Sequence, residues 1–439
     1  GGMSFHGGMF GVFLAMLWIA WRNSLNVLRV FDYVVVGVPM GMLLGRLANF
    51  VNGELWGRVE SKTMSETIEI RRGLDGVVSD ETAISKVMAE TNSLTYRGYA
   101  VQDLCEHSNF EETAHLLLKG ELPNATELAA FQKAERSNRQ ISDDLIAVIA
   151  RFPKDAHPMD TIRTGVSFLG MEDKDCWNHE PQALLEKSIQ LLARIPTIIA
   201  TDYRFRKGMD RIAPRADLDF NENFFHMCFG EVPDAATLRC FDISMILYAE
   251  HSFNASTFTA RTIASSLSEI YAAVTGAIGS LKGPLHGGAN EAVMHMLLEV
   301  GEPDNAEAWM RDALANKKKV MGFGHRVYKN GDSRVPTMHN AFVEMARHKG
   351  EMKWVEIEKV LSTIMIDEKG IHPNLDYPAG PSYYLMGFDI DMFTPIFVMS
   401  RITGWAAHVM EQLDNNRLVR PLSAYNGVAQ RPVTPLAER

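Results

Sequence analysis

Apolar residues recur at steps of three and four over most of the chain that follows residue 80. The run from Arg261 to Ser280 places apolar side chains on one helical face, at Ile263, Leu267, Ile270, Val274 and Ile278. The run from Glu291 to Val300 repeats the pattern, and further helices are predicted at residues 114–120, 145–149, 184–200 and 396–402. Strand-like alternation is scarce, with one short strand predicted at Ile68–Gly76. The pattern predicts an all-α fold without an internal repeat.

The first sixty residues differ in character from the rest. They contain two apolar runs, at residues 9–20 and 34–44. Each run is shorter than the ~20 residues of a full membrane span, so periodicity does not separate a truncated span from a core helix. No basic stretch precedes the first run and no small-residue cleavage site follows it, which argues against a secretory signal. A change of composition at residues 60–63 and the initiator-like Met64 divide the chain into residues 1–60 and 64–439.

Composition narrows the class of protein. A chain of 439 residues is long enough for two or three domains, and its 46% hydrophobic content can fill a substantial core. The formal net charge of −10 argues against a nucleic-acid partner. The four cysteines are scattered without a Cys-x-x-Cys pair, so we expect free thiols rather than a disulfide framework or a zinc site. No phosphate loop, dinucleotide fingerprint or His-Glu-x-x-His motif occurs. We therefore expect an acidic, soluble, cytoplasmic enzyme with no bound cofactor and no metal.

Four breaks between predicted helices carry polar or ionisable groups. In Gly283-Pro284-Leu285-His286-Gly287-Gly288, one histidine lies among glycines, which let a substrate approach the backbone closely. The N–H groups at the start of the next helix favour an anion. The other three breaks contain His251 with Asn254, His325 in residues 322–329, and Asp376 in residues 374–381. One such break would be an ordinary loop, but four in one helical chain indicate a site.

Three arginines are candidate clamps for substrate carboxylates: Arg334, Arg401 and Arg420. Arg401 lies within an apolar helix and would be costly to bury without an anion, although a salt bridge to a neighbouring acid is the alternative. Histidines supply hydrogen-bond donors near neutral pH and a carboxylate supplies a base. Together these residue types predict a site for a substrate with two or more carboxylates.

Over residues 64–439 the chain resembles the citrate synthase superfamily. The resemblance rests on the motifs Gly-Pro-Leu-His-Gly-Gly-Ala-Asn, Gly-Phe-Gly-His-Arg-Val-Tyr and Asn-Leu-Asp, in the family's order and spacing. It implies condensation of an acyl-CoA with oxaloacetate, followed by hydrolysis of the thioester. It also implies a homodimer with shared active sites, each chain having a large helical domain (64–285 and 385–439) and a small helical domain (286–384) that closes over the active site.

The resemblance also implies roles for individual residues. Asp376 matches the base that takes the α-proton of the acyl-CoA, His286 the donor to the thioester carbonyl, and His325 the acid that polarises the ketone. Five further residues match oxaloacetate-binding positions: His251, Asn254, Arg334, Arg401 and Arg420. In the family, the position of Arg420 is contributed from across the dimer interface. The backbone near CoA is matched by Gly322, Phe323 and Gly324.

The preferred acyl group is the harder question. Residues 383–388 and 420–427 look more like 2-methylcitrate synthases, which use propionyl-CoA, than housekeeping citrate synthases, which use acetyl-CoA. One extra methylene is worth only ~1–3 kcal/mol in a pocket, so we expect activity with both. Housekeeping citrate synthase is the alternative interpretation.

A second resemblance lies at the start of the chain. Residues 45–58, in the pattern Gly-Arg-x-x-Asn-Phe-x-Asn-x-Glu-x-x-Gly, and His6-Gly7-Gly8 resemble prolipoprotein diacylglyceryl transferase, a polytopic membrane enzyme. In that family His6 and Arg46 would correspond to positions near the lipid headgroup. Because only an internal fragment is matched, we interpret residues 1–60 as a non-catalytic remnant or a fusion artefact, with membrane contact only if this segment functions. A transferase with a helical appendage and a non-catalytic helical scaffold are the competing hypotheses.

Overall fold

The computed structural model describes residues 5–26, 70–88, 90–325, 327–328 and 331–439, with residues 5–13 described by backbone alone. The chain forms two compact units, one of residues Gly1–Val77 with Leu422–Arg439 and one of residues Val78–Pro421. The first unit contains helix α1 (Phe5–Arg22) and two 3-10 turns, η1 (Arg72–Leu74) and η3 (Leu436–Glu438). The predicted functional residues after residue 250 all lie in the second unit.

The second unit begins with a small antiparallel sheet in the order β1-β2-β3, formed by β1 (Ser85–Met88), β2 (Ser93–Tyr96) and β3 (Tyr99–Ala100). Ser85 lies opposite Tyr96, which in turn lies opposite Tyr99. The helices that follow, with one further 3-10 turn, are α3 (Val101–His107), α4 (Phe110–Lys119), α5 (Ala125–Ser137), α6 (Asp143–Ile149), α7 (Pro158–Glu172), α8 (Pro181–Arg206), α9 (Phe220–Phe229), α10 (Ala235–Tyr248), α11 (Ala255–Ala264), α12 (Ile270–Leu281), α13 (Ala289–Val300), α14 (Pro303–Ala315), α15 (Val335–Lys349), α16 (Lys353–Lys369), α17 (Asp376–Leu385), η2 (Ile390–Met392) and α18 (Phe393–Asp414).

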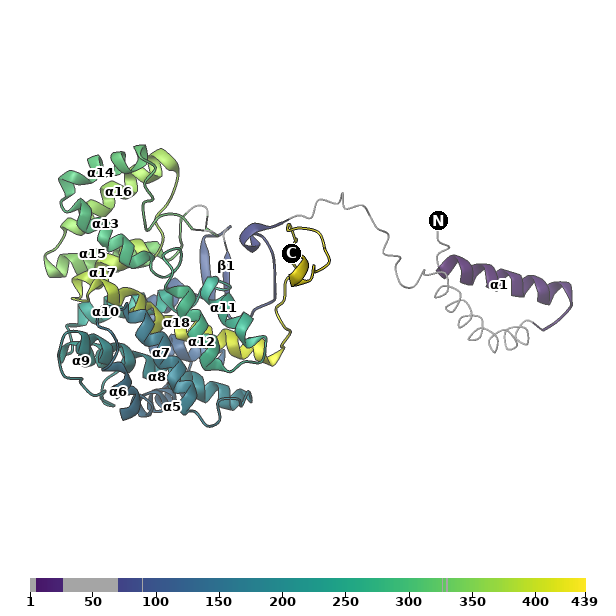
Figure 1. Ribbon diagram of the computed structural model, residues 1–439, viewed down its shortest axis with the longest axis horizontal. Helices are drawn as coiled ribbons and strands as arrows, with labels where there is room; N and C mark the ends of the chain where they lie inside the picture. The colour runs from purple at the N-terminus through teal and green to yellow at the C-terminus, as the bar shows by residue number, and fades with distance from the viewer. Residues whose placement is uncertain (1–4, 27–69, 89, 326, 329–330) are drawn as a thin grey trace. The chain divides into compact units, whose positions relative to one another are not determined.

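Helix α18 lies at the centre of this unit. Its residues from Phe393 to Val409 are all buried, and it packs against α8, α10, α11 and α12. A helix that is apolar nearly all round has no solvent face, so neighbours must cover it on every side. Figure 1 shows α18 among these helices, with α13 to α16 gathered at the other end of the unit. The predominantly helical fold expected from the sequence is confirmed.

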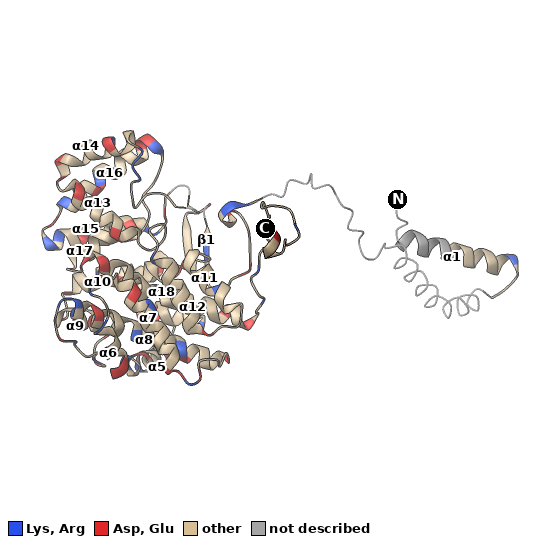
Figure 2. Cartoon of the chain, viewed as in Figure 1, with Lys and Arg blue, Asp and Glu red and all other residues tan. Residues whose placement is uncertain are grey.

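Figure 2 shows basic and acidic positions interspersed over the helices of the second unit. All four cysteines are free.

Two local predictions from the sequence are wrong. Within the predicted strand Ile68–Gly76, the described residues 70–76 form no strand and contain the 3-10 turn η1, with Gly73 at a φ of +67°. The predicted helix over residues 261–280 is broken between α11 and α12, where Leu267 has a φ of +64° and a side chain that is 54% exposed. The spacing of apolar residues therefore extends across a turn that is not helical, and spacing alone could not reveal the break.

The expectation of no internal repeat is also wrong. The helix pair α4–α5 recurs as α9–α10 at a spacing of 110 residues. In each pair the first helix ends at a left-handed glycine, Gly120 or Gly230, and the second starts at a capping side chain, Asn124 or Asp234. The two copies share Phe110/Phe220, Glu112/Glu222, Gly120/Gly230, Glu121/Glu231, Pro123/Pro233, Ala125/Ala235, Leu128/Leu238 and Phe131/Phe241.

The two helix pairs meet at their equivalent first residues, Phe110 and Phe220. The rings of Phe110 and Phe220 are 5.0 Å apart. The N–H of Phe110 donates to Asp242 in the second pair, and the N–H of Phe220 donates to Glu111 in the first. The repeat escapes inspection of the sequence because most shared positions are caps and turns, while the apolar positions between them differ in type.

The segment that resembles prolipoprotein diacylglyceryl transferase lies mostly outside the described residues. Residues 45–58, including Arg46, are not described, and His6 lies in α1, where only the backbone is described. Within the described part of the chain, no helix is both long enough and apolar enough to cross a membrane.

Candidate active site

His286 lies in the tight turn between α12 and α13. A Cβ atom at Gly287 would lie 2.5 Å from the Leu281 side chain and 2.7 Å from its carbonyl oxygen, so this turn requires glycine. The Nε2 atom of His286 is 3.3 Å from the backbone N–H of Ser256, which can only donate. Because Nε2 accepts this bond, the neutral ring holds its proton on Nδ1. Burial and the nearby Arg401 lower the pKa of His286 to about 3, so the ring is neutral at pH 7.

Two residues that the sequence analysis missed hold His286 from α11 and α18. Ser256 Oγ is 2.8 Å from His286 Nε2, and it accepts a hydrogen bond from Trp405 Nε1 at 3.1 Å. Asn254, predicted to bind substrate, caps α11 by accepting the N–H of Thr257, and it also contacts Ser256 Oγ at 2.8 Å. The contacts of Asn254 therefore help to position Ser256, which holds His286.

Asp376 lies at the start of α17. Its Oδ1 accepts a hydrogen bond from the Tyr248 hydroxyl at 2.7 Å, and its backbone N–H donates to Asn374 at 3.1 Å. Burial raises the pKa of Asp376 to about 6, against the opposing effects of the Tyr248 hydrogen bond and Arg334. The carboxyl group is thus ionised at neutral pH but far more basic than an exposed aspartate, as a general base requires.

The Gly322–His325 loop runs beside the segment that leads into Asp376. Gly324 N–H donates to the His372 carbonyl at 2.8 Å, and Asn374 N–H donates to the Gly322 carbonyl at 2.9 Å. A Cβ atom at Gly322, whose φ is +82°, would lie 2.7 Å from the Tyr377 ring. These contacts bring two motifs that are 51 positions apart in sequence into one wall.

His325 at the end of that loop is also neutral. Its Nδ1 accepts the N–H groups of Val327 and Tyr328 at 3.1 and 3.3 Å, so its proton is on Nε2. Burial, with the positive charge of Arg334, lowers the pKa of His325 to about 4. The His251 ring is centred 5.0 Å from that of His325, and the Nε2 atom of His251 has no hydrogen-bond partner among the described residues. Burial and Arg334 hold the pKa of His251 well below its ordinary value.

The two buried arginines of the site differ in their partners. Arg334 forms a two-point ion pair with Asp332, with Nε–Oδ1 and Nη2–Oδ2 distances of 3.0 and 2.7 Å. Arg401 donates from Nε to the Tyr248 carbonyl at 2.7 Å, and its guanidinium carbon lies 4.7 Å from the centre of the Phe397 ring. Among the described residues, no carboxylate forms an ion pair with Arg401. The described residues therefore give Arg401 no direct salt bridge, contrary to the alternative interpretation, whereas Arg334 has one.

Arg420 is the one predicted residue that the structure does not bring into this cluster. It is exposed on the extended segment after α18 and makes no hydrogen bond or ion pair with the other predicted residues. Two further site residues, Tyr248 and Asp332, were missed. Asp332 could have been found from its place two residues before Arg334, whereas nothing in the sequence marks Tyr248 as the partner of Asp376.

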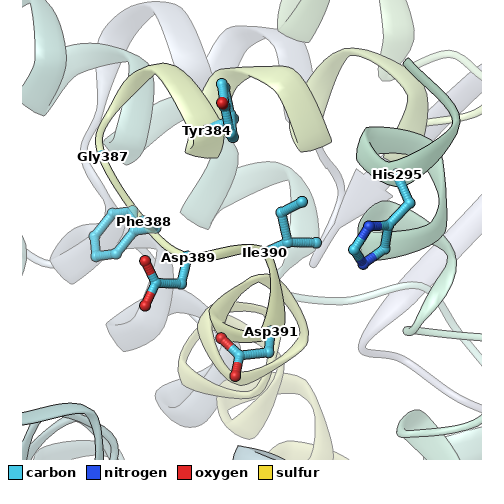
Figure 3. Close-up of a pocket in the computed structure, with 7 residues that line it drawn as sticks. All are labelled: His295, Tyr384, Gly387, Phe388, Asp389, Ile390 and Asp391. Carbon is cyan, nitrogen blue, oxygen red and sulfur yellow. The ribbon is translucent and has the colours of Figure 1, made fainter. Parts of the chain in front are cut away.

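A cavity of about 660 Å³ lies elsewhere, lined by His295, Tyr384 and the turn of residues 387–391. Figure 3 shows the Tyr384 ring and the His295 imidazole on separate helices, with the turn below Tyr384 and to the left of His295. None of the predicted site residues lines it, so we assign the chemistry to the cluster of neutral histidines and Asp376 rather than to this cavity. Among the described residues, no group of three or more His, Cys, Asp or Glu side chains is arranged to hold a metal ion.

Known proteins resemble the chain in two places. The family model for prolipoprotein diacylglyceryl transferase matches residues 1–101, which agrees with the resemblance of the first sixty residues. The family model for the citrate synthase C-terminal domain matches residues 73–422.

Relatives and solved structures give the same picture over most of the chain. A 2-methylcitrate synthase of Mycobacterium tuberculosis is 56% identical over 369 residues, covering 84% of this chain and 93% of that protein. A citrate synthase of Mycolicibacterium smegmatis is 54% identical over 369 residues, covering 84% and 98%. The solved citrate synthase of Thermoplasma acidophilum, in complex with carboxymethyl coenzyme A and oxaloacetate, is 32% identical with a TM-score of 0.80, and covers 84% of this chain and 100% of that one. The chain belongs to the citrate synthase family.

Proposed function

We propose that this enzyme condenses propionyl-CoA with oxaloacetate and hydrolyses the thioester, releasing 2-methylcitrate and CoA, and that it also accepts acetyl-CoA. One observation carries the proposal. Two neutral histidines, one carboxyl group with a raised pKa and one buried arginine, which has no ion-pair partner in the described part of the chain, converge in the same cluster. These are the groups needed to remove a weakly acidic proton beside a carbonyl while holding a substrate with several carboxylates.

In the first step Asp376 takes the α-proton of the acyl-CoA, and His286 donates from Nδ1 to the thioester oxygen. A carboxylate alone is too weak a base for this proton, so the developing charge on oxygen needs a preorganised donor, typically worth ~3–4 kcal/mol. His286 suits this role because its Nε2 is occupied by Ser256 and its proton is on the opposite nitrogen.

In the second step the enol carbon attacks the ketone carbon of oxaloacetate, and the ketone oxygen takes the proton on Nε2 of His325. His251, Arg334 and Arg401 hold the oxaloacetate carboxylates. Water then cleaves the thioester, which yields the tricarboxylate and the CoA thiol. The backbone at Gly322, Phe323 and Gly324, opened by two glycines with positive φ, lies next to CoA in this scheme.

Oxaloacetate must bind before the enol forms, because water would otherwise quench it. We propose that residues 286–384 form the small domain that closes over residues 64–285 and 385–439. The grouping of α13 to α16 at one end of the second unit (Figure 1) supports this division. Gly387, with a φ of +92°, follows the second boundary and supplies a backbone position suited to a hinge.

The enzyme is proposed to act as a cytoplasmic homodimer in which Arg420 of each chain completes the partner's site. The exposed position of Arg420 beyond α18 supports such a role, since it leaves the side chain available to a second copy. Replacing Arg420 with Ala should weaken oxaloacetate binding, and mixed dimers with an Asp376→Asn chain should recover activity in one site. Loss of activity proportional to the variant fraction would contradict a shared site.

The acyl preference is tested by comparing kcat/KM for propionyl-CoA and acetyl-CoA and identifying both products. We expect propionyl-CoA to be favoured by up to the ~10- to 200-fold that one methylene can supply. The second candidate function, housekeeping citrate synthase, has the 54% identity of the Mycolicibacterium smegmatis enzyme in its favour. A kcat/KM higher for acetyl-CoA would establish it.

Residues 1–60 are proposed to be non-catalytic. The structural support is that the clustered site residues all lie in the second unit, Val78–Pro421. A protein that starts at Met64 should retain the full condensation rate without detergent. A truncated protein that folds but turns over slowly would assign a function to the first segment.

A further inference from the structure

Glu250 is a buried carboxylate with no role in the steps above. It follows α10, directly precedes His251, and is 0% exposed. Its Oε1 accepts hydrogen bonds from Ser85 Oγ at 2.9 Å and His408 Nε2 at 2.8 Å. Its Oε2 has no partner among the described residues. A carboxylate in such a place is costly unless a positive charge balances it.

Helix α18 places that positive charge nearby. Arg401, Gly404 and His408 are spaced by three and four residues and therefore share one face of the helix. A Cβ atom at Gly404 would overlap Glu250 Oε2 and would lie 2.5 Å from the Ala249 carbonyl oxygen. The free oxygen of Glu250 thus lies against α18 between Arg401 and His408, in room made by the missing side chain of Gly404.

His408 keeps Glu250 ionised. Its Nδ1 is 3.2 Å from Nη1 of Arg261, which can only donate, so Nδ1 accepts this bond and the proton on Nε2 points to Glu250. Arg261 is itself paired with Glu411 at 2.7 Å and Asp80 at 3.1 Å. Burial raises the pKa of Glu250, but His408, Arg401 and Ser85 together bring it below its ordinary value.

Arg401 has few other anions to face. The titratable or charged groups that influence it or feel its charge are Glu250, Tyr96, Arg334, Tyr248, His251, His286 and Asp376. Of these, the histidines are neutral, the tyrosines are protonated and Arg334 is paired with Asp332. Asp376 is ionised, but Glu250 has the largest effect among the groups that raise the pKa of Arg401. Glu250 is the carboxylate that α18 sets beside Arg401.

We propose that Glu250 is the internal counter-ion of Arg401, a positioning residue that balances this arginine in the empty site and thereby weakens the binding of oxaloacetate. The incoming carboxylate must share Arg401 with Glu250, so part of its attraction is already satisfied. The inference rests on the proposed function for the identity of the ligand, while the electrostatic coupling of Glu250 to Arg401 can be measured without any ligand.

The first test is Glu250→Gln, which keeps the shape and removes the charge. Calorimetric titration with oxaloacetate should give a Kd about threefold to tenfold lower than that of the wild type, since one opposing charge near the ligand is gone. The unliganded variant should melt at a lower temperature, and oxaloacetate should raise its Tm by more than it raises the wild-type Tm. Glu250→Asp, which restores the charge with poorer packing, should return the Kd toward the wild-type value. An unchanged or higher Kd in Glu250→Gln overturns the proposal.

A second route reaches the same charge state. His408→Leu removes the donor, so burial should protonate Glu250 and lower the oxaloacetate Kd as Glu250→Gln does. His408→Gln keeps an N–H donor and should stay near the wild type. The matched control is Glu358→Gln on α16, which also changes a buried glutamate paired with a histidine, His339, at 3.1 Å. Glu358→Gln should leave the Kd for oxaloacetate unchanged. If Glu250→Gln and Glu358→Gln lowered this Kd equally, the effect would be a general response to the loss of a buried charge and would overturn the proposal.

Failure of this proposal is distinguishable from failure of the proposed function. Wild-type protein that neither binds oxaloacetate nor condenses it would refute the function alone. A double-mutant cycle of Glu250→Gln and Arg401→Gln, read as Tm of the unliganded protein, then decides the pairing without any substrate. Non-additive changes support the counter-ion, and additive changes overturn it whatever the enzyme binds.

Discussion

The two buried arginines of the site have different surroundings. Arg334 lies with Asp332 and Asp376 in one wall of the site, the Arg334 wall, and Arg401 lies in the wall formed by α18. Asp332 neutralises Arg334 by a two-point ion pair, and its Oδ2 also accepts the N–H of Leu375, directly before Asp376. Arg401 on α18 has no carboxylate in ion-pair contact among the described residues. The first arrangement fixes the backbone next to the base. The second leaves a positive charge for a ligand, with Glu250 as a more distant balance.

Two arginines that are buried to a similar extent can therefore have different roles. The Asp332–Arg334 pair is expected to contribute to the shape of the site, since it joins the start of α15 to the start of α17. Arg401 is expected to contribute mainly to binding. Substitutions of the two arginines should therefore differ in their effect on stability, whereas both should weaken oxaloacetate binding.

The largest effect is expected at Asp376, on the Arg334 wall. Asp376→Asn should lower kcat by at least the ~10²- to 10⁴-fold that general-base catalysis supplies, with little change in the Kd for oxaloacetate. Stability should change in the opposite direction. The folded pKa of about 6 exceeds the ordinary value of 3.8, so the native state binds more protons and the wild type loses stability as pH rises through 4 to 6. Asn removes that cost, and the variant should have the higher Tm at pH 7 but not at pH 4. Turnover close to the wild type would contradict the assignment of the base.

The two arginines are compared directly by Arg334→Met and Arg401→Met. Arg334→Met leaves Asp332 buried without its cation and should lower the free energy of unfolding by about 3–5 kcal/mol. Arg401→Met should weaken oxaloacetate binding by about 2–5 kcal/mol, the usual cost of truncating one partner of a desolvated charge pair. Chemical denaturation and oxaloacetate titration of both variants measure the two effects. Equal losses of stability in both would remove the distinction between the walls.

Gly404→Ala probes the α18 wall by a steric route. The added methyl group would overlap Glu250 Oε2 and lie 2.5 Å from the Ala249 carbonyl oxygen, neither of which belongs to a flexible surface side chain. Overpacking of this kind typically costs about 1–3 kcal/mol. Thermal unfolding should show the loss, while Gly279→Ala on α12, where the nearest atom is 3.8 Å away, should be close to neutral. A wild-type Tm for Gly404→Ala would mean that α18 can move away from Glu250.

The sequence predicted parts of α4, α6, α8, α13 and α18, together with three of the four polar breaks, because both depend on local spacing. The fourth break is wrong, since residues 376–381 lie in helix α17. Arg401 was recognised because a charge inside an apolar helix is conspicuous. The short strands at residues 85–100 were missed because each is too brief for alternation to register. The predicted helix through Leu267 failed because apolar spacing is blind to a backbone that turns left-handed.

The missing parts of the site are contacts between distant residues. Tyr248 bonds Asp376 across 128 positions, and Trp405 bonds Ser256 across 149. Neither residue looks unusual in sequence, since a tyrosine or tryptophan in an apolar run is ordinary core. The role of Glu250 could not be predicted for a similar reason. Its hydrogen-bond partners, Ser85 in β1 and His408 in α18, are distant in sequence.

The smallest effect, and the finest probe of the Arg334 wall, is expected from Tyr248→Phe. The Tyr248 hydroxyl donates to the ionised form of Asp376 and so lowers its pKa, in opposition to burial. In the wild type, kcat/KM should fall about tenfold for each pH unit below about 6, as Asp376 becomes protonated. Removal of the hydroxyl should move this limb to higher pH by up to ~1 unit, while the rate well above pH 7 stays within a few-fold of the wild type. Trp405→Phe, which loosens the His286 support on α18 instead, should lower kcat without moving the limb. A limb that stays in place in Tyr248→Phe would mean that Arg334, rather than Tyr248, keeps Asp376 ionised.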